Sequence, residues 1–215
     1  DGHSILNRAF YGVPIFTNSE GLHTNAVFGF LNIMFKIIDS KQPDYMAVAF
    51  DVHQPTFRHE MFKDYKGTRK PMMEELREQV PVIKELLQKM NITTVELPGY
   101  EADDVIGTLS KKGEKAGMEV DVISGDRDLL QLASDHITIC IPKTKKGQTT
   151  VEEYNTEGVR KLYKVTPTEF IDVKALMGDS SDNIPGVPGI GEKGATAIIS
   201  QFGSIENAYD HADEI

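Results

Sequence analysis

The sequence is poor in cysteine and has no long hydrophobic run. Its 215 residues include one cysteine, which excludes an intrachain disulfide and a thiolate metal site. That residue, Cys140, lies in the apolar run 137–141, where a buried strand residue is expected. No stretch of about 18 apolar residues occurs, and no charged segment precedes a short apolar one, so neither a membrane span nor a signal peptide is predicted. The sequence therefore predicts a cytosolic protein with one sizeable core.

Positive charge is also scarce. The chain has 23 Lys and Arg against 33 Asp and Glu, which gives a formal net charge of −10. Taken as a sum, this charge argues against a nucleic-acid partner, because phosphates would be repelled. The cations are nevertheless gathered in short segments such as 58–70, and many carboxylates lie in short motifs that divalent cations would neutralise. The distribution of charge therefore leaves a nucleic-acid partner open, although composition alone favours an acidic, soluble surface.

Apolar periodicity predicts alternating helices and strands in the first two thirds of the chain. The predicted helices are 25–38, 74–90 and 102–116, with Pro81 as a possible kink, and the predicted strands are 45–50, 92–97, 119–124 and 137–141. This alternation indicates an α/β fold with a mainly parallel central sheet flanked by helices. A loop is predicted after Lys143, and short helices separated by Gly and Pro are predicted from Thr156. We expect an α/β core over residues 1–155 and a helical C-terminal subregion over residues 156–215.

Acidic residues follow most of the predicted strands. In an open parallel sheet, ligands bind beyond the carboxyl ends of the strands, so these positions are the first candidates for a site. The candidates are Asp51 after the first strand, Glu101, Asp103 and Asp104 after the second, Asp126 and Asp128 after the third, Asp1 at the start of the chain, and Asp179 and Asp182 further on. A single aspartate is more often a helix cap or a turn residue, but recurrence at strand ends favours a shared site.

The chemistry of such a site follows from its donors. Carboxylates that converge at one edge of a sheet repel one another and raise one another's pKa unless cations separate them. Oxygen donors without Cys or His favour Mg²⁺ or Mn²⁺, and two such ions activate a water and stabilise the leaving oxygen in phosphoryl displacement. Acid/base catalysis of sugar hydrolysis is an alternative, but it needs only two carboxylates and leaves the others unexplained.

Two further segments indicate nucleic-acid binding. Residues 57–70 interleave aromatic and cationic side chains, a mixture suited to single-stranded or frayed nucleic acid, although an exposed amphipathic helix and loop explains it equally well. Residues 186–195 form a glycine-rich hairpin whose amides can approach a phosphate. The order Gly-x-Pro-Gly-Ile-Gly at a helix start is typical of helix-hairpin-helix units that bind duplex backbone, and a simple tight turn is the alternative.

With these motifs in place, the sequence resembles the bacterial 5′-nuclease family, which includes the nuclease domain of DNA polymerase I and is related to flap endonucleases. The resemblance covers nearly the whole chain. The motifs that carry it are Asp1-Gly2-His3-Ser4 with Arg8-Ala9-Phe10-Tyr11, Phe50-Asp51, Phe57-Arg58-His59, Tyr65-Lys66-Gly67-Thr68-Arg69, Tyr100-Glu101-Ala102-Asp103-Asp104, Gly125-Asp126-Arg127-Asp128-Leu129-Leu130-Gln131, Met177-Gly178-Asp179 with Asp182-Asn183, and the glycine hairpin.

The resemblance implies a PIN-like 5′-nuclease fold with a helical arch at residues 53–73 and a helix-hairpin-helix at residues 184–203. It also implies that all nine carboxylates named above are metal ligands for two or more Mg²⁺ or Mn²⁺ ions. Arg8, Arg58, Lys66 and Arg69 would act near the scissile phosphate, with Lys66 as the candidate for transition-state stabilisation. Tyr65, Lys70, Gly186, Gly189, Gly191 and Lys193 would bind DNA, and a K⁺ ion would bind at the hairpin.

The function implied is that of a metal-dependent 5′→3′ exonuclease and structure-specific 5′ flap endonuclease in replication and repair. Its substrates would be DNA with a 5′ flap, nick or gap, including RNA-primer ends, and its setting the bacterial cytoplasm at the nucleoid. We expect a monomer with a covalently linked polymerase domain in the full-length protein. The sequence starts at the family's catalytic aspartate, so the first central strand is expected to be absent or to lie outside it. A catalytically idle DNA-structure binder and a PIN-type ribonuclease are the alternatives.

Overall fold

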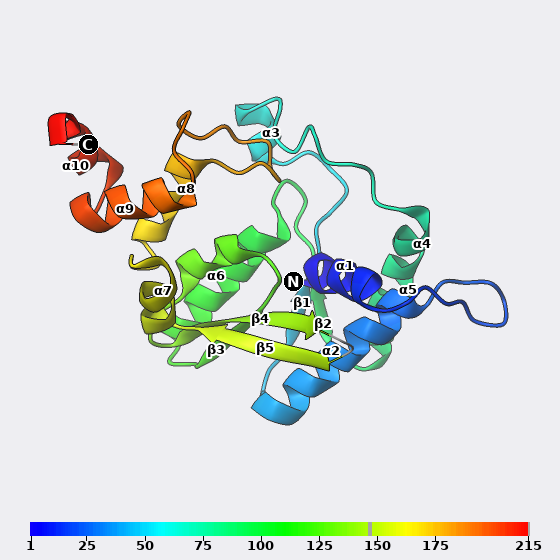
Figure 1. The fold of residues 1–215 in the computed structure, drawn as a ribbon. Helices are drawn as coiled ribbons and strands as arrows, with labels where there is room; N and C mark the ends of the chain where they lie inside the picture. The colour runs from blue at the N-terminus through cyan, green and yellow to red at the C-terminus, as the bar shows by residue number, and fades with distance from the viewer. Residues whose placement is uncertain (146–147, 215) are drawn as a thin grey trace.

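A computed structural model describes residues 1–145 and 148–214. Short strands lie in the middle of the molecule, with helix α6 above them and helix α2 below them in the view of Figure 1. The helices are α1 (Gly2–Gly12), α2 (Asn25–Lys41), α3 (Phe57–Met61), α4 (Glu74–Arg77), α5 (Gln79–Lys89), α6 (Ala102–Lys115), α7 (Thr156–Tyr163), α8 (Glu169–Met177), α9 (Glu192–Phe202) and α10 (Ile205–Asp210), with the 3-10 helices η1 (Arg127–Leu132) and η2 (Ala212–Glu214). The strands are β1 (Ala47–Ala49), β2 (Thr93–Val95), β3 (Val120–Ile123), β4 (Ile137–Lys145) and β5 (Gln148–Tyr154).

The strands belong to two small sheets within the described residues. Strands β1 and β2 pair in parallel, β3 pairs in parallel with β4, and β4 pairs antiparallel with β5. The predicted α/β class and the parallel pairing of the early strands are confirmed, but the sheet is divided rather than continuous. The loop predicted after Lys143 is wrong, because β4 continues to Lys145 and β5 pairs back along it. Strand β5 has no apolar run, and its pairing partner rather than its own hydrophobicity fixes it as a strand.

The apolar core is divided in a similar way. One cluster joins α1, α2, β1 and α5, and a second joins β3, β4, η1, α7, α8 and α9. Gly2 lies at the start of α1 against Phe50, so tightly that a Cβ on Gly2 would come within 2.3 Å of the Phe50 ring. This close approach requires glycine, and it places the first turn of α1, with Asp1 as its N-cap, beside the end of β1.

The predicted helix 74–90 is divided at Glu78 into α4 and α5. Pro81 lies in the first turn of α5, where a missing N–H costs little, so it marks a helix start rather than a kink. Gln79 is fully buried and its side-chain oxygen accepts the amides of Ala26 and Val27 at the start of α2. In the part of the chain that the structure describes, no helix has the length and apolar character needed to cross a membrane.

Candidate metal and nucleic-acid site

Asp51 follows β1 and is held by two neighbouring elements. Its carboxylate accepts the main-chain N–H of Ala102 at 2.8 Å, and its Oδ2 lies 3.4 Å from Nδ1 of His3. Burial would raise the pKa of Asp51, but the hydrogen bonds from His3 and the Ala102 amide outweigh it and lower the pKa to about 2. Asp51 is therefore ionised at neutral pH and fixed between α1 and the start of α6.

Asp1 and Asp126 are joined through a buried serine. The hydroxyl of Ser124 donates to Oδ2 of Asp1 at 2.8 Å and accepts the main-chain N–H of Asp126 at 3.0 Å. Ser4 donates its main-chain N–H to the other Asp1 oxygen at 3.0 Å, and its hydroxyl accepts the N–H of Gly125 at 2.9 Å. These bonds tie the N-terminus of α1 to the carboxyl end of β3.

The start of α6 brings three more carboxylates to the same place. Glu101 and Asp104 form a capping box at this helix start, and Glu101 is 7% exposed. Burial, followed by the negative charges of Asp126, Asp51 and Glu101, raises the pKa of Asp103 from 3.8 to about 7. Carboxylates from three strand ends therefore repel one another, and this repulsion together with burial destabilises the ionised form of Asp103.

Asp128, Asp179 and Asp182 extend this group toward the C-terminal subregion. The ammonium of Lys174, on α8, lies 2.9 Å from Asp128 Oδ1 and 2.7 Å from Asp179 Oδ2. Asp179 also accepts the amide and the hydroxyl of Ser181, and burial is outweighed by the bonds from Lys174 and Ser181, which lower the pKa of Asp179. The nine carboxylates named from the sequence are called the acidic cluster below. Lys174 was not predicted, because its role depends on packing of α8 against η1.

The arch segment, residues 53–73, contacts the acidic cluster directly. It contains one short helix, α3, and at the top of Figure 1 it lies beside the loop between α8 and α9. Both guanidinium NH groups of Arg58 donate to Asp104 at 2.7 Å, and this pair lowers the pKa of Asp104. Lys66 lies 2.7 Å from Glu101. Two of the predicted catalytic cations are therefore paired with predicted metal ligands.

Tyr65 and Arg69 complete this contact. The Tyr65 ring is 5% exposed, and its hydroxyl donates to Glu101 Oε2 and Asp182 Oδ2, each at 3.0 Å. Arg69 donates to a carboxylate oxygen of Asp182 and to the carbonyl of Ser181. Because Tyr65 is buried, its ring offers no exposed face for a base in this structure. Its hydroxyl instead links two carboxylates of the acidic cluster, a role that the sequence spacing did not indicate.

Arg8 differs from the other predicted catalytic cations. Its Nε is buried and has no hydrogen-bond partner among the described residues. Gly125 lies beside it, since a Cβ on Gly125 would be 3.4 Å from that nitrogen. A buried N–H without an acceptor is costly, and Arg8 as a whole is only partly buried, so it is a cation beside Gly125 with one donor left unpaired.

The glycine hairpin joins α8 to α9, and its glycines have different environments. A Cβ on Gly186 would lie 2.3 Å from the carbonyl carbon of Met177, so Gly186 permits backbone packing against the end of α8. Gly189 has φ +85° and Gly191 is the N-cap of α9, and a Cβ on either would meet open space. Gly189, Gly191 and Lys193 are exposed, as is Lys70 in the arch segment. Since α8 precedes residue 184, the range 184–203 contains the hairpin and only the second of its helices.

The acidic cluster fits a divalent cation in its donor chemistry. All its donors are carboxylate oxygens, and burial together with the neighbouring carboxylates raises the pKa of Asp103. Lys174, Lys66 and Arg58 already lie against its members. Within residues 1–145 and 148–214, however, no three His, Cys, Asp or Glu side chains are spaced to hold a metal ion. Occupation by a metal therefore requires side-chain movement in a cluster whose charge favours it.

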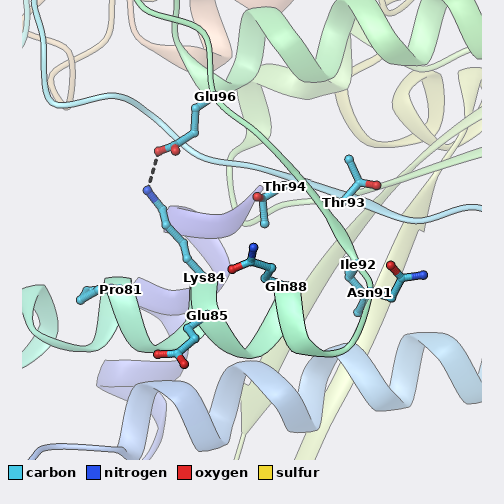
Figure 2. A pocket seen from close by; sticks show the side chains of 9 residues that line it. All are labelled: Pro81, Lys84, Glu85, Gln88, Asn91, Ile92, Thr93, Thr94 and Glu96. Atoms are coloured by element: carbon cyan, nitrogen blue, oxygen red, sulfur yellow. Dashed lines mark hydrogen bonds and ion pairs between the residues drawn. The ribbon is translucent and has the colours of Figure 1, made fainter.

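A separate hollow lies away from these groups. Figure 2 shows it between α5 and β2, with an ion pair between Lys84 and Glu96 at its border. Its volume is about 630 Å³, and its lining residues are Pro81, Lys84, Glu85, Gln88, Asn91, Ile92, Thr93, Thr94 and Glu96. None of the nine cluster carboxylates lines it.

Comparison with known families agrees with the geometry. The family model described as "5'-3' exonuclease, N-terminal resolvase-like domain" matches residues 1–164, and "5'-3' exonuclease, C-terminal SAM fold" matches residues 165–215. The chain belongs to the 5′-3′ exonuclease family. Relatives include the DNA polymerase I of Bacillus caldotenax, 53% identical, and that of Bacillus subtilis (strain 168), 52% identical, each over 215 residues. Each match covers 100% of this chain and 24% of the relative, so this chain spans about a quarter of their length.

Solved structures of the same family share this fold. The 5′-exonuclease of bacteriophage T5 with bound zinc ions has a TM-score of 0.77 and 27% identity, covering 98% of this chain and 77% of that chain. The T5 flap endonuclease in a pseudo-enzyme–product complex with DNA and metal ions has a TM-score of 0.77 and 28% identity, covering 98% and 76%. The predicted family and the PIN-like 5′-nuclease fold are thus confirmed.

Proposed function

We propose that this chain is a metal-dependent 5′ nuclease that removes 5′ flaps and 5′ ends, including RNA primers, during DNA replication and repair. The observation that carries the proposal is the acidic cluster. In it, carboxylates from three strand ends lie near those of Asp179 and Asp182, in the turn after α8. Membership of the 5′-3′ exonuclease family supports the same reaction class. Both the exonuclease and the flap endonuclease reactions are hydrolyses of a phosphodiester bond.

The acidic cluster would hold two or more divalent cations, Mg²⁺ or Mn²⁺. Bound there, such ions supply an activated water and neutralise the leaving oxygen in an in-line displacement. The chain's own groups prepare this binding. Hydrogen bonds keep Asp51 ionised, and Ser124 fixes Asp1 and Asp126 relative to each other.

The cations of the chain would bind the substrate phosphates. Arg8 is partly exposed and has an Nε without an acceptor, and its guanidinium would pair with a phosphate oxygen. Lys66, Arg58 and Arg69 are paired with carboxylates, and they would exchange those partners for phosphate when the cluster is neutralised by cations. In this proposal, Lys66 stabilises the charge that develops on the scissile phosphate.

Duplex DNA would bind at the C-terminal subregion. Gly189 and Gly191 expose backbone without side-chain obstruction, and Lys193 adds a charge in the first turn of α9. A K⁺ ion held by hairpin carbonyls would strengthen the contact with the phosphate backbone. Lys70, exposed in the arch segment, would contact the 5′ strand. Recognition of this kind depends on backbone and strand topology and is insensitive to base sequence.

In the full-length protein we propose that a polymerase domain follows this nuclease unit, as the relatives' name and length suggest. The polymerase would generate 5′ flaps by strand displacement, and the nuclease, acting as a monomer, would remove them. The place of action would be the bacterial cytoplasm, at the nucleoid.

Cleavage of matched substrates tests this proposal. The protein is incubated with a 5′-labelled flap duplex and with single-stranded RNA, each in Mg²⁺ and in EDTA. We expect release of short 5′ products from the flap duplex in Mg²⁺ alone. Preferential cleavage of the RNA would favour a PIN-type ribonuclease, and tight binding of the flap duplex without cleavage would favour an idle DNA-structure binder. Either result would overturn the proposal.

A further inference from the structure

Lys174 lies outside the sequence motifs named above. It lies on α8, whose buried face contains Phe170, Val173 and Leu176, so the backbone that carries it is fixed in the core. Its side chain is 23% exposed and its ammonium contacts two carboxylates from different parts of the chain, Asp128 on η1 and Asp179 after α8. Lys174 is therefore a partly buried cation in the middle of an anionic site.

The geometry is that of one cation shared by two carboxylates. Asp128 and Asp179 each present an oxygen within 3 Å of the same nitrogen. A divalent cation bridging these two residues would need the same oxygens at a somewhat shorter distance. The ammonium and such a cation cannot occupy this space together. They also repel each other by Coulomb's law, and partial burial weakens the screening of that repulsion.

We propose that Lys174 is the built-in counter-ion of the Asp128–Asp179 pair and competes with a divalent cation for these two carboxylates. In this role it is a positioning residue. It holds both carboxylates together in the metal-free protein, and it sets the cation concentration at which this part of the acidic cluster fills. This inference rests on the proposed function, because it assumes that the acidic cluster is a cation site.

The charges around Lys174 favour competition with a divalent cation over a purely structural role for this residue. Asp126 and Asp179 are the negative groups acting on Asp128, and Lys174 is the cation that opposes them. Asp179 has additional donors in Ser181 and the Asp182 amide, so it stays oriented when the ammonium leaves. Asp179 is thus retained as an oxygen donor after loss of Lys174, and the cluster loses one opposing positive charge.

The test is the affinity for Mn²⁺ of the DNA-free protein, measured by isothermal titration calorimetry. We expect Lys174→Met to bind Mn²⁺ on the order of tenfold more tightly than wild type, because one opposing charge is removed at short range. Lys174→Arg keeps the charge and should bind like wild type. Lys161→Met removes the same charge from an exposed position on α7, and it should change the affinity by less than about twofold.

Unchanged or weaker Mn²⁺ binding by Lys174→Met would overturn the inference. Circular dichroism checks that the variant is folded. Independently of any substitution, wild-type protein labelled with ¹³C in lysine side chains should show a shift of the Lys174 ε-carbon signal on saturation with Mg²⁺, and a stationary signal would contradict competition.

Flap cleavage separates this inference from the proposed function. If wild type cleaves flap DNA, Lys174→Met should reach its half-maximal cleavage rate at a lower Mg²⁺ concentration. If the same Mg²⁺ concentration is needed by both proteins, the competition by Lys174 is contradicted, while the proposed function is not. If wild type binds Mn²⁺ as described but does not cleave, the proposed function fails and the counter-ion role stands.

Discussion

Replacement of Asp103 by asparagine should stabilise the metal-free protein and abolish its cleavage activity. Asp103 lies at the start of α6, where burial and the charges of Asp126, Asp51 and Glu101 raise its pKa to about 7. A carboxyl group whose pKa is raised by folding favours the folded state only in its protonated form. Asp103→Asn keeps the shape of that protonated form at every pH.

The sign and size of the effect follow from the two pKa values. Well below pH 3.8, at about pH 2 to 3, Asp103 is protonated in both the folded and unfolded protein and costs almost nothing. As pH rises from 3.8 toward 7, the unfolded chain ionises first and the folded protein loses stability. Above pH 7 the full cost is reached, and a shift of this size corresponds to about 4 kcal/mol. The variant should therefore gain up to that amount at pH 8 and almost nothing at about pH 3.

Asp104→Asn provides a matched control on the next residue of the same helix. The pair with Arg58 lowers the pKa of Asp104, so this carboxylate stabilises the folded protein above its unfolded pKa and that contribution is lost as pH falls. Both variants change the net charge equally, yet their effects should have opposite signs at pH 8. Urea unfolding in EDTA across this pH range measures both. Equal or lower stability of Asp103→Asn than wild type at pH 8 would show that the ionised Asp103 carboxylate does not destabilise the folded protein.

Three further substitutions test other parts of the site. Ser124→Ala should lose about 2 kcal/mol in urea unfolding, because two buried groups lose their partner, and an unchanged unfolding midpoint would exclude that role. Gly186→Ala should lower the free energy of unfolding by about 2 kcal/mol and weaken duplex binding, because a Cβ would lie 2.3 Å from Met177. Gly191→Ala, where a Cβ meets open space, should be as stable as wild type. Equal losses of stability in the two variants would show that crowding at Gly186 is not the cause. Lys66→Ala should lower single-turnover cleavage about 100-fold, and a change in substrate affinity alone would assign Lys66 to binding.

The sequence predicted that acidic residues gather beyond the strand ends, because that signal is local. An apolar run followed within a few residues by aspartate marks both a strand and the positions beyond its carboxyl end, and Asp51 and Asp126 follow β1 and β3 in this way. The helix α6 was predicted from its periodicity within one residue of its observed end. Strand β5 was missed, because its residues have no apolar alternation and antiparallel pairing with β4 defines it.

The contacts within the site could not be read from the sequence. Tyr65 meets Glu101 across 36 residues and Asp182 across 117, and Lys174 joins an element of the core to the C-terminal turn. Such contacts depend on how helices pack, which spacing along the chain does not encode. Helix α1 was also missed, although Gly2 and Asp1 at its start carry the signals of close packing and an N-cap.

The most direct test of the account is whether one carboxylate of the acidic cluster separates cleavage from binding. Wild type and Asp126→Ala are compared on the same 5′-labelled flap duplex, with binding measured in Ca²⁺ and cleavage in Mg²⁺ with an EDTA control. If the acidic cluster holds the metal ions used in cleavage, wild type should cleave near the junction only with metal present. Asp126→Ala should lose this cleavage and still bind the flap duplex. Cleavage that persists in Asp126→Ala or in EDTA would contradict the proposed role of the acidic cluster.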